Sequence, residues 1–284
     1  MENVMNNKIE MANYDNKSFG ELVSIVVACY NGERYVDGCM RSLVCQTYQN
    51  IEILVCDDAS TDKSLYFLRQ WEKKDNRIKV LHNEKNLNIA ATRNRCLKEA
   101  KGLFVAIQDI DDVSDSRRIE LLVQSLKDSN VDFVSSSVGA FSKKWQDIDK
   151  VFSYKKIIPS KWAFLIGVPF FHPATMFSSS CLNAVKGYRV AKETRRAEDY
   201  DLFMRLYAAG YKGMCLPNIL YYYRLDEGNY RRRTFTARKD EMTVRLQGFK
   251  ALGLLPWGVP FVIKPLLAHV VMHAKLLISK PRNN

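Results

Sequence analysis

Short apolar runs rich in β-branched residues alternate with segments of helical periodicity over residues 22–141. The first run, LVSIVVACY at 22–30, is apolar at nearly every position, which is typical of a strand buried on both faces of a parallel sheet. Strands that alternate with helices predict right-handed crossovers and an α/β domain with a mostly parallel, Rossmann-like sheet flanked by helices. The predicted strands are 22–30, 51–58, 77–83, 102–109 and 131–141. The predicted helices are 33–48, 61–74, 88–102 (closed by Gly102), 116–129 and 197–210.

The charge of the chain indicates an anionic partner. Its 284 residues carry a formal net charge of +12, which suits nucleic acid, a phospholipid surface or a phosphorylated small molecule. The chain has no GxGxxG sequence after the first strand and no GxxxxGK[ST] sequence, which argues against a dinucleotide-binding fold and a P-loop. The seven cysteines include no CxxC pair, which argues against a zinc site. Residues 1–20 lack the layout of a signal peptide and are expected to be a disordered leader.

Polar residues stand where three of the predicted strands end. The sequences are YN at 30–31, DD at 57–58 and DIDD at 109–112. In open α/β sheets ligands bind beyond the carboxyl ends of the strands, so these residues are expected to share one site.

Asp109 and Asp111 are paired carboxylates on the loop after the fourth strand. In an extended backbone such a pair lies on one side of the chain, roughly 7 Å apart. Mg²⁺ and Mn²⁺ take oxygen ligands, often one or two carboxylates together with substrate phosphates. The alternative is a turn into a helix capped by Ser114 or Asp115, but one cap does not require three more acids. The pair therefore predicts a divalent metal site, where a cation relieves the repulsion among the acids.

Several segments together resemble the family 2 glycosyltransferases. VSIVVACYNGERYVDGCMRSLVCQTYQNIEILVCDDASTDKS resembles the start of that family, and QDIDD resembles its DxD motif. FHPATMF followed by AEDYDLFMRLYAAGYK resembles its acceptor-side half, so the likeness spans roughly 22–226 in the right order. The resemblance implies a GT-A fold, a nucleotide-sugar donor, a divalent metal (Mn²⁺ or Mg²⁺) and inversion at the anomeric carbon.

The resemblance also implies roles for individual residues. Asp58 matches the acid that binds a uracil ring, Asp111 the main metal ligand, and Asp109 a contact to the ribose or the metal. Asp199 matches the general base, which takes a proton from the acceptor hydroxyl; Glu198 and Asp201 compete for this role. The positions expected to contact the donor are Ala28, Tyr30, Glu33, Asp57, Asp58, Arg93 and Asp109, with Asp112 as a helper.

The chain departs from the family's pattern in places. Many members have glycine where this chain has Asn88, a residue that tolerates a left-handed backbone. Many carry a histidine after Tyr-Arg-x, where this chain has Asp226; Arg224 or the RRR sequence at 231–233 could then bind the diphosphate, although a solvated basic loop is the simpler interpretation. His172 is expected to be structural.

The end of the chain is apolar, interrupted by proline and edged with lysine. HVVMHAKLLISK at 269–280 has an apolar face beside basic residues, which suits a helix lying on an anionic membrane. The alternative is a helix that packs against the catalytic domain. We therefore expect a leader at 1–20, a GT-A domain at 21–230 and a helical extension at 231–284 that associates with membrane.

These features predict an inverting, metal-dependent glycosyltransferase of hexosyl or N-acetylhexosaminyl type. The expected donor is a UDP-sugar and the acceptor a surface polysaccharide or lipid-linked glycan. The expected location is the cytoplasmic, inner face of the cell membrane, with no nucleic-acid partner. A sugar nucleotidyltransferase is the nearest alternative, but ACYNGERYV is not the Gly-rich basic loop that such enzymes carry. A non-catalytic basic protein that binds membrane or nucleic acid would explain the charge and leave the acids at three strand ends without a role.

Overall fold

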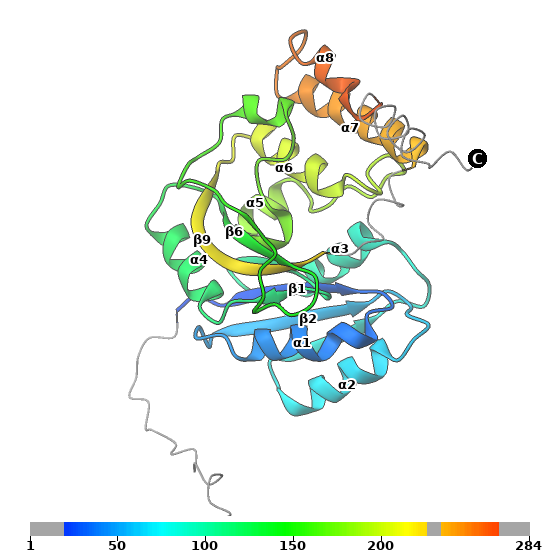
Figure 1. The fold of residues 1–284 in the computed structure, drawn as a ribbon, viewed down its shortest axis with the longest axis vertical. Helices are drawn as coiled ribbons and strands as arrows, with labels where there is room; N and C mark the ends of the chain where they lie inside the picture. Colours follow the sequence, from blue (N-terminus) through cyan, green and yellow to red (C-terminus); the bar gives the residue numbers. More distant parts are fainter. Residues whose placement is uncertain (1–19, 226–233, 267–284) are drawn as a thin grey trace, which may run out of the picture.

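A computed structural model of the chain describes residues 20–225 and 234–266 (Figure 1). Its sheet has the strand order β3-β2-β1-β4-β8-β6-β9-β5, with β7 paired to β6. The strands are β1 (Val23–Cys29), β2 (Ile51–Asp57), β3 (Ile78–His82), β4 (Phe104–Asp109), β5 (Val113–Ser114), β6 (Phe133–Phe141), β7 (Lys150–Phe152), β8 (Thr175–Ser178) and β9 (Gly213–Arg224). The helices are α1 (Glu33–Val44), α2 (Ser64–Lys74), α3 (Ile89–Glu99), α4 (Arg118–Lys127), α5 (Ser179–Ala184), α6 (Glu198–Ala208), α7 (Phe235–Ala251) and α8 (Val259–Val262), with 3₁₀ turns η1 (Lys161–Leu165) and η2 (His172–Ala174).

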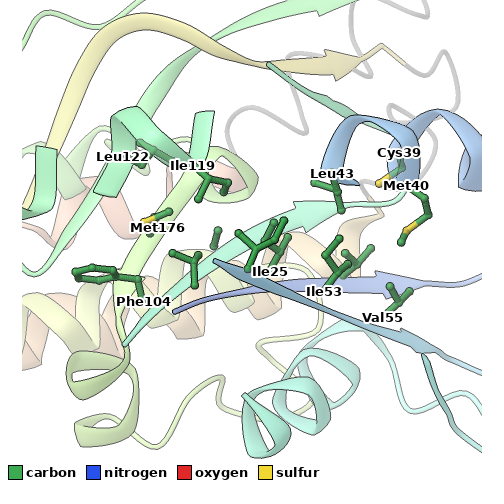
Figure 2. Close-up of a cluster of buried hydrophobic side chains, with 14 of the residues drawn as sticks. Ile25, Cys39, Met40, Leu43, Ile53, Val55, Phe104, Ile119, Leu122 and Met176 are labelled. Carbon is green, nitrogen blue, oxygen red and sulfur yellow. The ribbon is translucent and has the colours of Figure 1, made fainter. Parts of the chain in front are cut away.

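Both faces of the sheet are covered, as the continuous apolar strands predict. Val23, Ile25 and Val27 of β1 pack with α1, α2 and α4 on one face, in the cluster that Figure 2 draws. Val26 packs with α3, α5 and α6 on the other face. Figure 1 shows α1 and α2 on one side of β1 and β2, with α6 and α7 on the opposite side. This double burial explains why polar residues are scarce along the strands until they end.

The α/β fold class is confirmed, and β1 to β4 are parallel to one another. Beyond β4 the sheet becomes mixed, because β8 runs antiparallel to both β4 and β6. Sequence periodicity did not predict β5, β7, β8 or β9. In β9 the register shifts between Leu216 and Ile219, so Pro217 and Asn218 form a bulge beside β6. A proline at a bulge interrupts the strand pattern in the sequence without ending the strand.

The described part of the C-terminal extension packs on the domain. The apolar cluster that contains α6 also buries Phe249 of α7, Val262 of α8, and Leu254 between these two helices. Gly248 lies so close to Met204 of α6 that a Cβ there would meet the thioether sulfur. Residues 234–266 therefore share the core of the domain, while the segment 269–280 and the Asp226 and 231–233 positions lie outside the described residues. Within the described ranges, no helix is long and apolar enough to cross a membrane.

Two glycines provide a matched test of packing. Helix α3 ends at Glu99, so Gly102 does not cap it as expected; instead, a Cβ on Gly102 would lie 2.6 Å from the Ser24 backbone nitrogen and 2.7 Å from the Leu22 oxygen. We expect Gly102→Ala to lower the free energy of unfolding by at least ~2 kcal/mol, because backbone atoms of β1 would have to move. Gly38→Ala in α1, where a Cβ meets nothing within 4 Å, should raise it by about 0.5–1 kcal/mol. Urea unfolding of both variants measures the contrast, and similar values for the two would contradict this packing.

Candidate active site

The strand ends converge as the sequence predicts. The parallel register places Cys29 of β1 beside Asp57 of β2, and Ala28 of β1 beside Asp109 of β4. The acids that follow β2 and β4 therefore flank the end of β1, where Tyr30 is half exposed. This edge of the sheet is the centre of the candidate site.

The two acids after β2 organise the loops around this edge. Asp57 is buried; its Oδ2 accepts the Ser60 backbone N–H at 3.1 Å and lies 3.0 Å from Nδ1 of His82. Asp58 is also buried, and its Oδ1 accepts from the Asn83 side-chain amide at 2.7 Å and the Leu87 backbone N–H at 2.8 Å. Its Oδ2 accepts the backbone N–H of Asn88, whose φ is +69° with ψ 161°, a positive-φ conformation outside the left-handed helical region. Asp58 therefore holds the 83–88 loop and keeps acceptor capacity on Oδ2.

Glu33 connects the loops after β1 and β2. It is exposed, and its Oε2 accepts the Lys63 backbone N–H at 2.8 Å. Asn31, with φ +50°, accepts the Thr61 backbone N–H at 2.8 Å through its side-chain oxygen. These bonds fix the rim of the site next to Tyr30.

A buried arginine joins the two halves of the site. Arg93 of α3 donates to Oδ1 of Asp109 at 2.6 Å and to Oε1 of Glu198 at 3.3 Å. Its guanidinium also lies over the ring of Tyr188, 5.6 Å from the centroid. The hydroxyl of Tyr188 is 2.7 Å from Nε2 of His172, a buried residue whose pKa is held well below its usual value by burial. Arg93 thereby links the DIDD loop to the first turn of α6.

The DIDD loop is held by β9. Asp112 is buried, and its Oδ1 accepts the backbone N–H of Arg224 at 2.7 Å. The Arg224 side chain donates to the Asp111 carbonyl oxygen at 3.0 Å, and the Asp109 backbone N–H donates to the Tyr221 hydroxyl at 3.1 Å. Arg224 therefore contacts the loop that carries the predicted metal ligands.

Helix α6 begins with three acids that differ in their partners. Asp201 forms ion pairs with Arg189 at 2.9 Å and with Arg205 at 2.7 Å, so its role is structural. Asp199 accepts the Tyr200 backbone N–H at 2.7 Å and forms no ion pair with a described residue. Burial raises its pKa, and attraction to Arg93 opposes the rise. Among the described residues, Asp199 is the acid of the three that forms no ion pair, which suits a proton acceptor.

Glu198 provides a pH test of this arrangement. Burial, and after it the charge of Asp199, raises its pKa to about 7 from 4.5. A carboxyl whose pKa is raised on folding stabilises the folded state below the unfolded pKa, and this contribution is lost as the pH rises through the folded pKa. Between pH 4.5 and about 7, the free energy of unfolding should therefore fall more in the wild type than in Glu198→Gln. Urea unfolding across this range measures the difference; parallel curves would mean that Glu198 stays ionised against Arg93.

The acids fit a divalent cation. Oδ2 of Asp112 is buried with no hydrogen-bond partner among the described residues. Burial, and after it the charges of Asp111 and Asp109, raises the pKa of Asp112 well above its usual range, which a nearby cation would offset. Within the described part of the chain, no three His, Cys, Asp or Glu side chains form a metal-holding group. Asp109 and Asp111 would supply the one or two carboxylates that Mg²⁺ commonly takes when phosphates complete its coordination.

Sequence reasoning did not single out Tyr188 or Tyr221. Tyr188 follows Gly187, which has φ +66°, in an irregular segment without periodicity. Tyr221 belongs to a YYYR sequence, where the alternation of β9 buries it and leaves Tyr222 partly exposed. An aromatic run before Arg224 was the available signal, but its strand register depends on the distant β6.

Comparisons with known proteins agree with this geometry. EpsE of Bacillus subtilis (strain 168), whose name assigns it to the glycosyltransferases, is 34% identical over 250 residues, which cover 87% of this chain and 89% of EpsE. UDP-Glc:alpha-D-GlcNAc-diphosphoundecaprenol beta-1,3-glucosyltransferase WfaP of Escherichia coli is 29% identical over 209 residues, which cover 74% of this chain and 79% of WfaP.

Solved structures share the fold. The crystal structure of S. aureus TarS 1-349 in complex with UDP-GlcNAc has a TM-score of 0.66 at 18% identity, covering 81% of this chain and 70% of TarS 1-349. Mannosyltransferase PcManGT from Pyrobaculum calidifontis in complex with GDP-Man and Mn²⁺ has a TM-score of 0.62 at 18% identity, covering 91% of this chain and 81% of PcManGT. The likeness confirms the GT-A architecture. The sequence model of Glycosyl transferase family 2 matches residues 24–182. With this match and the similarity to EpsE along most of both chains, the protein belongs to glycosyl transferase family 2 and is a glycosyltransferase.

Proposed function

We propose that the enzyme transfers a hexosyl or N-acetylhexosaminyl group from a UDP-sugar to a lipid-linked or surface-polysaccharide glycan, with inversion. The observation that carries this proposal is the link from Asp109 through Arg93 to the first turn of α6, which brings the DIDD loop and Asp199 into one site. A single displacement requires a donor-binding edge and a carboxylate that takes the acceptor proton, and this link supports the assignment of both roles to neighbouring residues.

In this mechanism Asp199 takes the proton from the acceptor hydroxyl as that oxygen attacks the anomeric carbon. Arg93 keeps Asp109 and Glu198 in place, and burial raises the pKa of Asp199, which makes it a stronger base. Asp111, with Asp109, would hold Mn²⁺ or Mg²⁺, which when bound neutralises charge on the leaving diphosphate. The manganese in the PcManGT complex supports this assignment.

The choice of UDP rests on Asp58 and on relatives. A carboxylate accepts a hydrogen bond from the imide N–H of uracil. Oδ2 of Asp58 can still accept one, while the hydrogen bonds that Asp58 already receives fix the loop. Ala28, Tyr30, Glu33 and Asp57 surround the same edge. UDP-GlcNAc in the TarS complex and UDP-Glc in the name of WfaP support a uridine donor, and the diphosphoundecaprenol in that name supports a lipid-linked acceptor. Such an acceptor fits a protein bound to the inner, cytoplasmic face of the cell membrane.

A panel of nucleotides with and without Mn²⁺ tests the donor. We expect UDP and UDP-sugars to raise the unfolding temperature by several degrees when Mn²⁺ is present, since a ligand at 100 times its Kd contributes about 2.7 kcal/mol. GDP and ADP at equal concentration serve as controls and should give a much smaller shift. Stabilisation by GDP-sugars above UDP-sugars would refute the uridine assignment. Release of pyrophosphate from UTP and a sugar phosphate would instead identify a nucleotidyltransferase.

A further inference from the structure

A surface that is both apolar and basic lies where η1 meets α8. Five large apolar side chains on these two segments are between 46% and 72% exposed. They are Trp162, Ile166, Trp257, Val259 and Ile263, and we name them the η1–α8 surface. Large apolar side chains exposed on two neighbouring segments favour contact with a partner or a membrane.

The η1–α8 surface stands on a fixed base. Lys264 donates to the backbone oxygen of Ile166, and Lys161 donates to the backbone oxygen of Leu252 at 2.9 Å, so the two segments are joined at both ends. A Cβ on Gly258 would lie 3.2 Å from Leu165, which shows how closely α8 approaches η1. Phe249 and Val262 are buried beneath them. The exposed side chains are therefore displayed by packed structure.

The two segments that form this surface carry charges of one sign. The segments 155–170 and 250–266 contain no Asp or Glu, and residues 242–284 contain none either. The lysines on the two segments are all exposed: Lys155, Lys156, Lys161, Lys250 and Lys264. Tryptophan beside lysine, without acids, is the composition of a surface that sits at the boundary between acyl chains and anionic headgroups. A protein partner of mixed charge would bring cations of its own to this surface, and the two segments offer no carboxylate to pair with them.

We propose that the η1–α8 surface binds the anionic face of a lipid bilayer. The inference rests on the proposed function in one respect: a lipid-linked acceptor gives the contact its purpose. It differs from the membrane contact expected from sequence, which the extension at 231–284 was to make by itself, because it also uses η1, a segment whose role the sequence pattern did not reveal. Trp162 and Trp257 enter the headgroup region, and the lysines meet the lipid phosphates.

Sedimentation of the full chain with vesicles tests the proposal. The wild type should sediment with vesicles of equal phosphatidylcholine and phosphatidylglycerol, and remain in solution with phosphatidylcholine alone. Ile166→Ser with Trp257→Ser should weaken binding about tenfold or more, because two anchors are removed from the boundary. The matched control is Leu103→Ser with Val190→Ser, two apolar side chains that are 54% and 62% exposed elsewhere in the fold, and it should bind as the wild type does.

Charge reversal is the second arm. Lys156→Glu with Lys250→Glu should also weaken binding about tenfold, and 0.5 M salt should reduce the wild type to the same level. Hydrolysis of UDP-sugar without vesicles is measured for every variant, so loss of the enzyme activity and loss of the membrane contact are separate results. Unchanged vesicle binding in both double variants would overturn the proposal. So would a wild type that is dimeric without vesicles and becomes monomeric on substitution, which would assign the surface to a second copy of the chain.

Discussion

Asp199→Asn should bind UDP as tightly as the wild type, yet transfer sugar at least ~10²-fold more slowly. Asparagine keeps the size of the side chain and can still accept the Tyr200 backbone N–H, so the start of α6 is preserved. What it lacks is the basic oxygen that takes the proton from the acceptor. Titration with UDP and Mn²⁺ measures binding, and transfer to a glycan acceptor measures the rate.

Asp201→Asn is the matched control, because that acid lies two residues away in the same turn and is held by Arg189 and Arg205. It should lower the unfolding temperature and leave the rate per folded molecule near that of the wild type. Glu198→Gln tests the remaining competitor for the role of base: it should slow transfer less than Asp199→Asn, because Glu198 is paired with Arg93 and is not the proposed proton acceptor. If Glu198→Gln is the slower of the two, the base has been assigned to the wrong carboxylate.

Asp111→Ala should abolish the effect of Mn²⁺ on activity, with transfer slowed by at least roughly 10²-fold, because a bound metal contributes several kcal/mol of charge stabilisation to the leaving diphosphate. The same variant should lose the Mn²⁺-dependent stabilisation by UDP, which is a readout independent of catalysis. Activity against the concentration of Mn²⁺, measured for both proteins, gives the result directly.

Asp115→Ala is the control for Asp111→Ala. Asp115 belongs to the same run of acids, but its Oδ1 accepts the Arg117 backbone N–H at 2.9 Å at the start of α4. It should cost about 1 kcal/mol of stability as a lost hydrogen bond in the turn before α4 and leave the response to Mn²⁺ intact. Full activity of the wild type in the presence of a chelator would remove the metal from the mechanism.

The sequence predicted the parts of the fold that depend on neighbours in the chain. The continuous apolar strands and the turns after them placed Asp57 and Asp109 at one edge, because parallel strands carry their ends to the same side.

The partners of the acids could not be predicted in the same way. Arg93 meets Glu198 across 105 positions, and the Arg224 backbone meets Asp112 across 112. Both contacts depend on the order of strands beyond β4, where β8 is antiparallel and β9 carries a bulge. Sequence therefore identified the acids as a group, whereas the tertiary pairings decide which of them is free to act as a base.

Helix α6 has a further consequence for the choice of acceptor. Asp199 stands in its first turn, while Met204, about one and a half turns on, is locked against Gly248 of α7, which leads directly into α8. Packed helices therefore connect the proposed base to the surface that we assign to the bilayer. This packing would hold the proposed base at a fixed height above the lipid. We therefore expect the enzyme to prefer glycans whose reactive hydroxyl lies at that height over shorter or longer ones.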